Sequence, residues 1–255
     1  MNAPNYRVRN FLTAVAVLRD KIAEPDAYPF SIPAIGALRE IEFEQPVTFF
    51  IGENGSGKST LLEAIAVRWG LNPEGGSRNF SFSTRASHSS LKDYLRLVRS
   101  PRRMRDSFFL RAESYFNVAT QIDQLDEDPL AGPSIIRHYG GRSLHEQSHG
   151  ESFFALFMNR FGGDGFYILD EPEAALSPAR QMEFLKLLRR MEESTICQVV
   201  MATHSPMLMA YPGARLLRLS KYGLEAVTVK DTDHYKVMRE FCADPAGFVE
   251  AVIAE

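Results

Sequence analysis

Nine residues between positions 52 and 60 have the types and the spacing to bind an anion. Gly52, Gly57, Lys58 and Ser59 match the pattern G-x-x-x-x-G-K-[ST] of a phosphate-binding loop. Glycine lets the backbone turn successive N–H groups toward one point, and a helix starting at Lys58 would add positive potential there. Lys58 would contact the β- and γ-phosphates of a nucleotide, and the Ser59 hydroxyl would ligate Mg²⁺. The predicted nucleotide-binding residues of this loop are Gly52, Glu53, Asn54, Gly55, Ser56, Gly57, Lys58, Ser59 and Thr60.

Two carboxylates that follow an apolar run supply a second set of chemical groups. Phe166–Leu169 predicts a buried strand, and Asp170 and Glu171 come directly after it. An aspartate at this position could hold Mg²⁺ through water beside Ser59, and the glutamate could orient and deprotonate an attacking water. Paired acids also occur as plain surface caps of strands, but a phosphate loop upstream favours the catalytic interpretation. Lys58 and Glu171 are therefore predicted catalytic residues.

These groups need a strand, a turn and a helix to position them. Val47–Ile51 predicts a buried strand before the loop, and the helix that starts at Lys58 should stop near Trp69 and Gly70. A glycine-rich turn that only caps a helix is the alternative, and the flanking strand and helix argue against it.

Near the N-terminus, Phe11–Leu18 superficially resembles a signal peptide. This run is too short to span a bilayer and lacks a small-residue cleavage site, so we interpret it as another strand.

Composition excludes several classes of protein. The 255 residues are 45% hydrophobic and 24% charged, as in an ordinary globular protein, and the net charge of -3 gives no overall nucleic-acid signature. Cys197 and Cys242 are far apart and have no C-x-x-C partner, so we expect neither a zinc site nor a disulfide framework. A reducing cytoplasm is the expected location, and no segment approaches transmembrane length.

Basic residues concentrate between Leu91 and Arg111. Leu91, Leu95 and Val98 recur at helical spacing, which predicts a helix, and Ser107–Leu110 predicts a strand. The basic residues are Lys92, Arg96, Arg99, Arg102, Arg103, Arg105 and Arg111. They could form a surface for nucleic acid or for an acidic partner, or a solvated face that a predicted acidic loop over 123–128 neutralises.

A further anion-binding element is predicted shortly before the paired carboxylates. Gln147-Ser148-His149-Gly150-Glu151 opens a helix whose phenylalanines, Phe153, Phe154, Phe157 and Phe161, would pack inward. The Ser148 hydroxyl, the Gly150 N–H and the helix N-terminus could bind phosphate together. This arrangement resembles the ATP-binding cassette family, whose signature motif Leu-Ser-Gly-Gly-Gln lies at this distance before the strand-end acids. Glu151 stands where that family commonly has glutamine.

Three other segments are similar to motifs of that family. Ala174–Pro178 resembles its D-loop, with Ser177 where aspartate is frequent, and Ser177 would also cap the next helix. Val199–Ser205 predicts a buried strand that ends in a histidine, His204. The resemblance makes His204 the switch histidine that binds the γ-phosphate and the water. The family's glutamine loop matches best at Glu113, which would bind Mg²⁺ or the attacking water beside Ser59 and Asp170. Gln121 is the alternative match for this loop.

The resemblance implies a fold and an activity. The expected fold is α/β: a mostly parallel central sheet, an antiparallel strand layer and a small helical lobe. Residues 1–255 would form one domain, with 1–86 and 150–230 as the nucleotide-binding core, 87–149 as the helical lobe with the signature segment, and 231–255 as C-terminal helices. The implied reaction is Mg²⁺-dependent hydrolysis of ATP to ADP and phosphate.

The resemblance also implies partners. In this family the signature of one subunit closes over the nucleotide of the other, so an ATP-dependent homodimer is expected. The segments Tyr28–Ile35 and Asp231–Tyr235 resemble those of stand-alone bacterial ATPases related to the heads of DNA-repair and chromosome-maintenance proteins. This likeness favours a DNA-repair or defence-like function with a DNA or protein partner over a membrane. One alternative is the nucleotide-binding subunit of a transporter, which the altered signature disfavours. The other is an ATP-dependent interaction module, which the presence of Glu171 disfavours.

Overall fold

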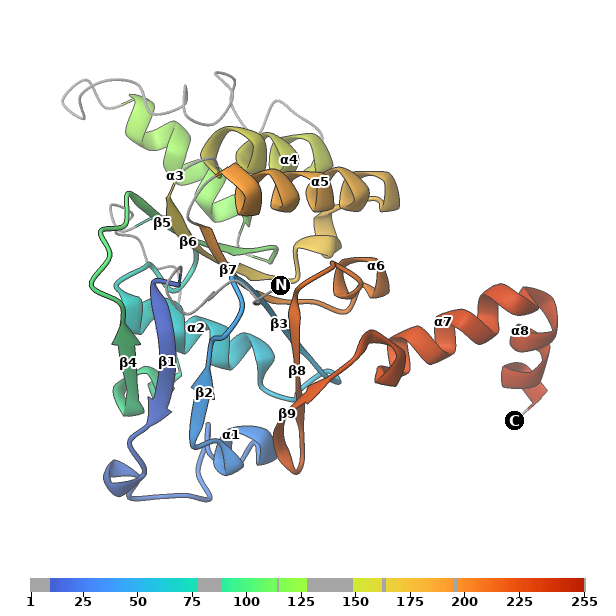
Figure 1. Cartoon of the computed structure of the whole chain (residues 1–255), viewed down its shortest axis with the longest axis horizontal. Coiled ribbons are helices and arrows are strands. Elements are labelled where there is room, and N and C mark those ends of the chain that lie inside the picture. Colours follow the sequence, from blue (N-terminus) through green and yellow to red (C-terminus); the bar gives the residue numbers. More distant parts are fainter. Residues whose placement is uncertain are drawn as a thin grey trace, which may run out of the picture.

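The strands of the protein form two sheets in the part of the chain that the structure describes. A computed structural model describes residues 10–77, 89–113, 115–127, 149–161, 164–194 and 197–254 (Figure 1). Within these ranges a six-stranded sheet has the order β5-β6-β7-β3-β8-β9, and a three-stranded sheet has the order β2-β1-β4. The predicted α/β class, with a mostly parallel sheet and an antiparallel layer, is confirmed.

The six-stranded sheet carries the segments that hold the candidate site. In spatial order its strands are β5 (Asp106–Arg111), β6 (Gly165–Asp170), β7 (Cys197–Ala202), β3 (Val47–Ile51), β8 (Arg215–Ser220) and β9 (Gly223–Val227). All neighbours run parallel except β8 and β9, which form an antiparallel hairpin. Parallel strands present their carboxyl ends at one edge, so the residues that follow β3, β5, β6 and β7 meet there.

The three-stranded sheet corrects one prediction. Its strands are β1 (Leu12–Val17), β2 (Glu40–Glu42) and β4 (Leu95–Arg99). The helix expected from Leu91, Leu95 and Val98 is not formed, because a 3₁₀ turn over Ser90–Tyr94 leads into β4, which pairs with β1. Leu95 and Leu97 face inward and Arg96 faces solvent, so the chain follows an alternation of period two that competes with the helical spacing.

Helices lie on both faces of the central sheet. The α-helices of the described ranges are α1 (Pro33–Ala37), α2 (Lys58–Trp69), α3 (Tyr115–Glu127), α4 (His149–Arg160), α5 (Pro178–Ser194), α6 (Pro206–Met209), α7 (Asp233–Ala243) and α8 (Pro245–Ala254). The acidic loop predicted over 123–128 is wrong for Asp123, Asp126 and Glu127, which lie in α3, and Asp128 lies outside the described residues. Among the described residues of the proposed lobe over 87–149, the first α-helix is α3, which follows β4 and β5.

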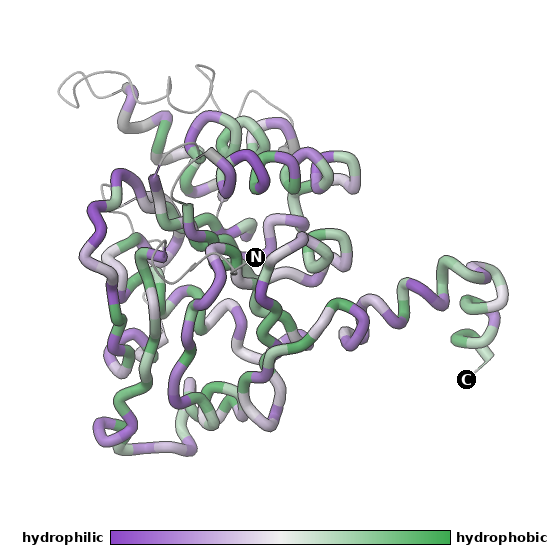
Figure 2. The backbone as a smooth tube through the Cα atoms, in the orientation of Figure 1, coloured by the Kyte–Doolittle hydropathy of each residue, from purple (hydrophilic) through white to green (hydrophobic). Residues whose placement is uncertain are grey.

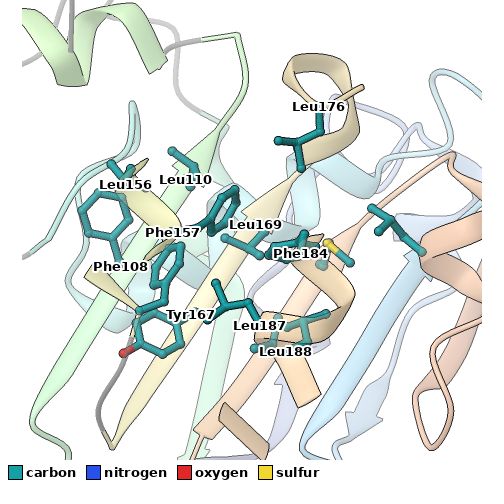
Figure 3. Close-up of a cluster of buried hydrophobic side chains, with 14 of the residues drawn as sticks. Phe108, Leu110, Leu156, Phe157, Tyr167, Leu169, Leu176, Phe184, Leu187 and Leu188 are labelled. Carbon is teal, nitrogen blue, oxygen red and sulfur yellow. The ribbon is translucent and has the colours of Figure 1, made fainter. Parts of the chain in front are cut away.

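Alternate residues of the central strands enter two hydrophobic cores. Phe108, Tyr167 and Leu169 pack with α3, α4 and α5 (Figure 3). Phe109 and Phe166 face the other way, into the core around α2, where the Trp69 and Phe166 rings are 4.6 Å apart. In Figure 2 hydrophobic residues run along the central strands, whereas α5 alternates between hydrophobic and hydrophilic residues. Burial on both faces explains why the strand sequences are continuously apolar.

The last two helices leave the body of the protein. α7 and α8 extend away from both sheets (Figure 1), and neither contains a buried residue. The C-terminal helices expected over 231–255 are present as α7 and α8. The length and apolarity that a membrane crossing requires are found in no helix of the described ranges.

Candidate functional site

The predicted phosphate loop lies between β3 and α2. The backbone at Gly52 has a φ of 145°, and a Cβ there would lie 2.5 Å from the Leu219 carbonyl oxygen. At Gly57, φ is 97° and a Cβ would lie 2.9 Å from a side-chain carbon of Ile35. Both positions combine a left-handed backbone with close neighbours, so glycine is required at each. The loop therefore curls tightly before the N-terminus of α2.

Lys58 occupies the mouth of this loop. Its side chain is buried, and Nζ donates to the carbonyl oxygens of Gly52 and Glu53, each at 2.9 Å. Burial lowers the pKa of the Lys58 ammonium, while the carboxylates of Glu171 and Asp170 oppose that shift. Because these carbonyls already accept from Nζ, a phosphate entering the loop would compete with them for the same donor.

An ion-pair network joins α2, β5 and β6 beside the loop. The Ser59 hydroxyl donates to Asp170 Oδ1 at 3.0 Å, and Arg111 Nε donates to Asp170 Oδ2 at 3.1 Å. Arg111 Nη1 also donates to Glu63 at 3.0 Å. Burial raises the pKa of the Asp170 carboxyl, and the Arg111 guanidinium beside it opposes that shift. The structure thus brings Ser59 and Asp170 together, as the sequence predicted.

Arg111 is a site residue that sequence analysis missed. The sequence grouped it with the basic segment, yet the parallel register of β5 and β6 places Arg111 opposite Asp170. Its position directly after the apolar run of β5 was the available signal, because the residue ending a parallel strand lies at the functional edge.

Arg99 also has internal contacts. Its guanidinium lies 4.1 Å from the centre of the Trp69 ring and donates to the Arg68 and Trp69 carbonyls at 3.2 Å.

Glu171 has an uncommon backbone conformation. Among the described residues it is the one non-glycine with a positive φ, at 52°. Such a conformation costs about 1–3 kcal/mol and persists where surrounding contacts impose it. Here the Glu171 N–H donates to the Ala202 carbonyl at 3.0 Å, which ties the end of β6 to β7. The turn directs a half-buried carboxylate toward the same edge as Ser59 and Asp170.

His204 faces the Glu171 carboxylate. The distance between His204 Nε2 and Glu171 Oε1 is 3.4 Å, and His204 Nδ1 lies 3.0 Å from His234 Nε2. The backbone N–H of His204 donates to the Glu173 carboxylate. Burial, with the positive charge of Lys58 nearby, lowers the pKa of His204 to about 4, so the ring is neutral at pH 7. Glu173 and His234 were not predicted. His234 in particular is 30 residues away on another element, and the likeness of the Asp231–Tyr235 segment to other ATPases gave it no role in the site.

Two cavities open at this edge of the sheet. The smaller, of about 190 Å³, is lined by Ser59, Arg111, Ala112, Glu113, Asp170, Glu171, Ala174 and Ala175. Glu113 thus shares a cavity with Ser59 and Asp170, whereas Gln121 lies in α3 with its side chain outside the described part of the chain. The larger cavity, of about 980 Å³, is bounded by the loop over 51–56, α1, His204, the β8–β9 hairpin and the start of α7. Its volume suits a small-molecule ligand the size of a nucleotide.

The predicted signature segment is described only from its second half. Ser148 lies outside the described residues, and Gly150 lies in the first turn of α4. Phe153, Phe157 and Phe161 are buried, as predicted. The predicted cap at Ser177 is also present, since the Arg180 N–H donates to its hydroxyl at 3.4 Å.

Removing the Arg111 guanidinium is expected to destabilise the protein strongly. In Arg111→Met the Asp170 carboxylate, only 4% exposed, loses its cationic partner, and breaking a buried pair in this way costs about 3–5 kcal/mol. Urea unfolding followed by circular dichroism measures the change. Arg189→Met is the control, because its pair with Glu193 lies on the exposed face of α5 and its loss should leave the midpoint unchanged. Equal midpoints for the two variants would contradict a stabilising role for Arg111.

Comparisons with known proteins agree with this arrangement. The family described as AAA domain matches residues 32–126, and a second AAA-domain family, whose description adds a type IV TA system, matches residues 136–210. The thiamine import ATP-binding protein ThiQ of Cereibacter sphaeroides is 31% identical over 173 residues, which are 61% of this chain and 69% of that protein. ATP-binding cassette sub-family A member 7 of Rattus norvegicus is 22% identical over 180 residues, 68% of this chain but 8% of that protein.

The fold has a matching solved structure. An inward-facing metal-chelate type ABC transporter aligns with a TM-score of 0.50 and 17% identity, over 90% of this chain and 88% of that chain. Similarity at this level supports the fold, and the match to ThiQ supports the family. The ordered site described above, from the phosphate loop to His204, is consistent with both. The chain therefore belongs to the ATP-binding cassette family of ATPases, which bind and hydrolyse ATP.

Proposed function

We propose that this chain hydrolyses ATP at the carboxyl edge of its central sheet and that ATP closes two copies into a dimer. The observation that carries the proposal is that a loop lysine and two pairs of residues meet at this edge. Lys58 lies in the loop, Ser59 contacts Asp170, and His204 faces Glu171. These are the positive charge, the metal ligands and the base that phosphoryl transfer to water requires.

The larger cavity would bind the nucleotide, and the smaller cavity would bind its metal ion. The loop over 51–56 lines the larger cavity, which would hold the nucleotide, with its phosphates on the backbone N–H groups and Lys58. The Ser59 hydroxyl and the Asp170 and Glu113 carboxylates around the smaller cavity are hard oxygen ligands, and this donor set fits Mg²⁺. Bound Mg²⁺ would neutralise charge on the phosphates during transfer.

The chemical step follows from the placement of Glu171 and His204. Glu171 accepts a proton from water while the water oxygen attacks the γ-phosphorus and the bond to the bridging oxygen of ADP breaks. Lys58 stabilises the charge that develops on the departing β-phosphate. The neutral His204 ring donates a hydrogen bond to the γ-phosphate without adding a second positive charge beside Lys58.

The partner is proposed from chemistry and from family likeness. Arg96, Arg103 and Arg105 have exposed side chains and lack the contacts that Arg99 makes to α2, and they offer a basic surface for duplex DNA across the dimer. The transporter alternative is favoured by one observation, the likeness to a thiamine import ATP-binding protein. We place the protein in the cytoplasm in both cases, as one domain whose nucleotide-binding core includes β4 and β5 and whose helical lobe starts at α3.

A hydrolysis assay with added effectors tests this function. Phosphate release by the purified protein should require Mg²⁺ and stop with EDTA. Duplex DNA should stimulate turnover, and its binding should weaken with salt, with a slope of about -0.9 per phosphate neutralised. Stimulation by membrane extract and not by DNA would favour the transporter alternative.

Two arginine variants separate the DNA surface from structural arginines. Replacing Arg96, Arg103 and Arg105 by glutamate should remove DNA binding and leave basal turnover unchanged, since none of the three lies in the site. Arg99→Glu is the matched control for structure, because Arg99 holds the end of α2 and its loss should lower the melting temperature. If the parent protein has no DNA affinity at low salt, the DNA part of the proposal is wrong.

A further inference from the structure

The start of α7 contacts the candidate switch histidine. His234 lies in the first turn of α7, and its Nε2 is 3.0 Å from Nδ1 of His204. The two rings are tilted by 53° with centres 5.1 Å apart, so the contact is a hydrogen bond between ring edges and not a stack. His234 also lines the larger cavity together with the phosphate loop. None of the motifs predicted to bind nucleotide or metal includes this residue.

The direction of this hydrogen bond follows from the group on the other side of His204. Its Nε2 faces the Glu171 carboxylate at 3.4 Å, and a carboxylate can only accept. The favourable arrangement therefore puts the ring hydrogen of His204 on Nε2. A neutral imidazole has one N–H, so Nδ1 must accept, and Nε2 of His234 must donate. The opposite assignment would point the Nε2 lone pair of His204 at a carboxylate.

Both rings are in an environment that keeps them neutral. Burial, with the Lys58 ammonium nearby, lowers the pKa of His204 and of His234, although Asp233 opposes the shift at His234. A neutral pair is required for the hydrogen-bond direction deduced above, because a doubly protonated His204 would place an N–H against the donor of His234.

The backbone near His204 is fixed, which leaves its ring to be oriented by His234. The Thr203 N–H donates to the Phe50 carbonyl at 3.2 Å, and the His204 N–H donates to Glu173. These bonds locate the peptide chain and make no contact with the imidazole. Among the described residues, the His204 ring forms one hydrogen bond, and its partner is His234. His234 is thus placed to determine both the tautomer and the rotation of that ring.

His234 is itself held firmly. Thr232 caps α7, since its hydroxyl accepts from the Tyr235 N–H at 3.2 Å and donates to the Val229 carbonyl at 2.7 Å. Thr232 is buried, and Asp231 just before it caps the preceding turn through Thr228. The first turn of α7 is therefore anchored to the body, while the rest of the helix extends away from it.

We propose that His234 is a positioning residue for ATP hydrolysis. Its Nε2–H donates to Nδ1 of His204, so that the Nε2–H of His204 points toward Glu171 and the γ-phosphate side of the cavity. The inference rests on the proposed roles of His204 and Glu171, and it goes beyond them by giving the C-terminal helix a part in the reaction.

Three substitutions of His234 differ in what they can donate. Glutamine keeps an N–H donor, glutamate at pH 8 can only accept, and leucine does neither. We expect His234→Gln to keep kcat within about threefold, and His234→Glu and His234→Leu to lower kcat by about 10–100-fold, the usual cost of losing such an outer partner. The Kd for ATP should remain within about threefold in all three. Lys236→Ala, on the exposed side of the same helix, is the control for a disturbed α7 and should match the parent.

Nitrogen-15 NMR of the parent protein tests the inference without any variant. The His204 ring should show a protonated Nε2 and an unprotonated Nδ1, and the His234→Glu variant should reverse this pattern. A parent His204 protonated at Nδ1, or a full kcat in His234→Leu, would overturn the proposal.

Failure of this inference is distinguishable from failure of the proposed function. If His204→Ala lowers kcat while the His234 variants do not, only the positioning role is wrong. If His204→Ala and Glu171→Gln both retain full turnover, the proposed function itself is wrong.

Discussion

Replacing Lys58 with alanine is expected to abolish ATP turnover. The ammonium is the positive side chain of the loop, and a hydrogen bond from a charged donor contributes about 1.5–3 kcal/mol. Contacts to both the β- and γ-phosphates would together be worth about 3–6 kcal/mol, which corresponds to roughly 10²–10⁴ in nucleotide affinity and rate. The loss should be seen in binding as well as in turnover, because Lys58 contacts the phosphates before and during transfer.

Fluorescent ATP binding and phosphate release measure these two effects. Because Lys58 Nζ also donates to the Gly52 and Glu53 carbonyls, the variant must be compared with the parent in thermal unfolding. Lys186→Ala is the matched control, since Lys186 lies on the exposed face of α5 and pairs only locally with Glu183 at 2.8 Å. Undiminished hydrolysis by a folded Lys58→Ala variant would remove the central claim about the loop.

Sequence predicted the parts of the site that are local. The loop over 52–60 is one continuous segment whose glycines, lysine and hydroxyls have a fixed spacing, so its structure depends little on the rest of the chain. The edge at which β3, β6 and β7 end was also predictable, because each strand is a short apolar run followed by polar residues. That is why Ser59, Asp170, Glu171 and His204 were named in advance and lie together in the structure.

Contacts between distant segments were not predictable in the same way. Arg111 reaches Asp170 through the register of β5 and β6, which depends on strand pairing across 59 residues. His234 meets His204 because the β8–β9 hairpin returns the chain to the loop before α7 starts. The helix predicted from Leu91 to Val98 was wrong for a related reason, because the pairing of β4 with β1 outweighed the helical spacing of the apolar residues.

The Glu171→Gln variant is expected to bind ATP, to hydrolyse it slowly and to remain dimeric. Glutamine preserves the size of the side chain and its backbone bond to Ala202, while the carboxylate that accepts the proton is lost. Loss of a general base lowers the rate by about 10²–10⁴, and the contacts of Lys58, Ser59 and Asp170 to nucleotide and metal remain. If ATP closes the dimer and hydrolysis opens it, slow hydrolysis must increase the population of the closed form.

Size-exclusion chromatography coupled to light scattering measures that population. Glu171→Gln with ATP and Mg²⁺ should elute as a dimer, and without nucleotide as a monomer. Glu193→Gln, on the exposed side of α5, should behave like the parent and hydrolyse ATP normally. Adding Ser148→Arg to Glu171→Gln should break the dimer without weakening ATP binding to the monomer, because the signature acts on the nucleotide of the other copy. A Glu171→Gln protein that stays monomeric at saturating ATP would show that the site is complete within one chain, and the closing of two copies would then have no part in hydrolysis.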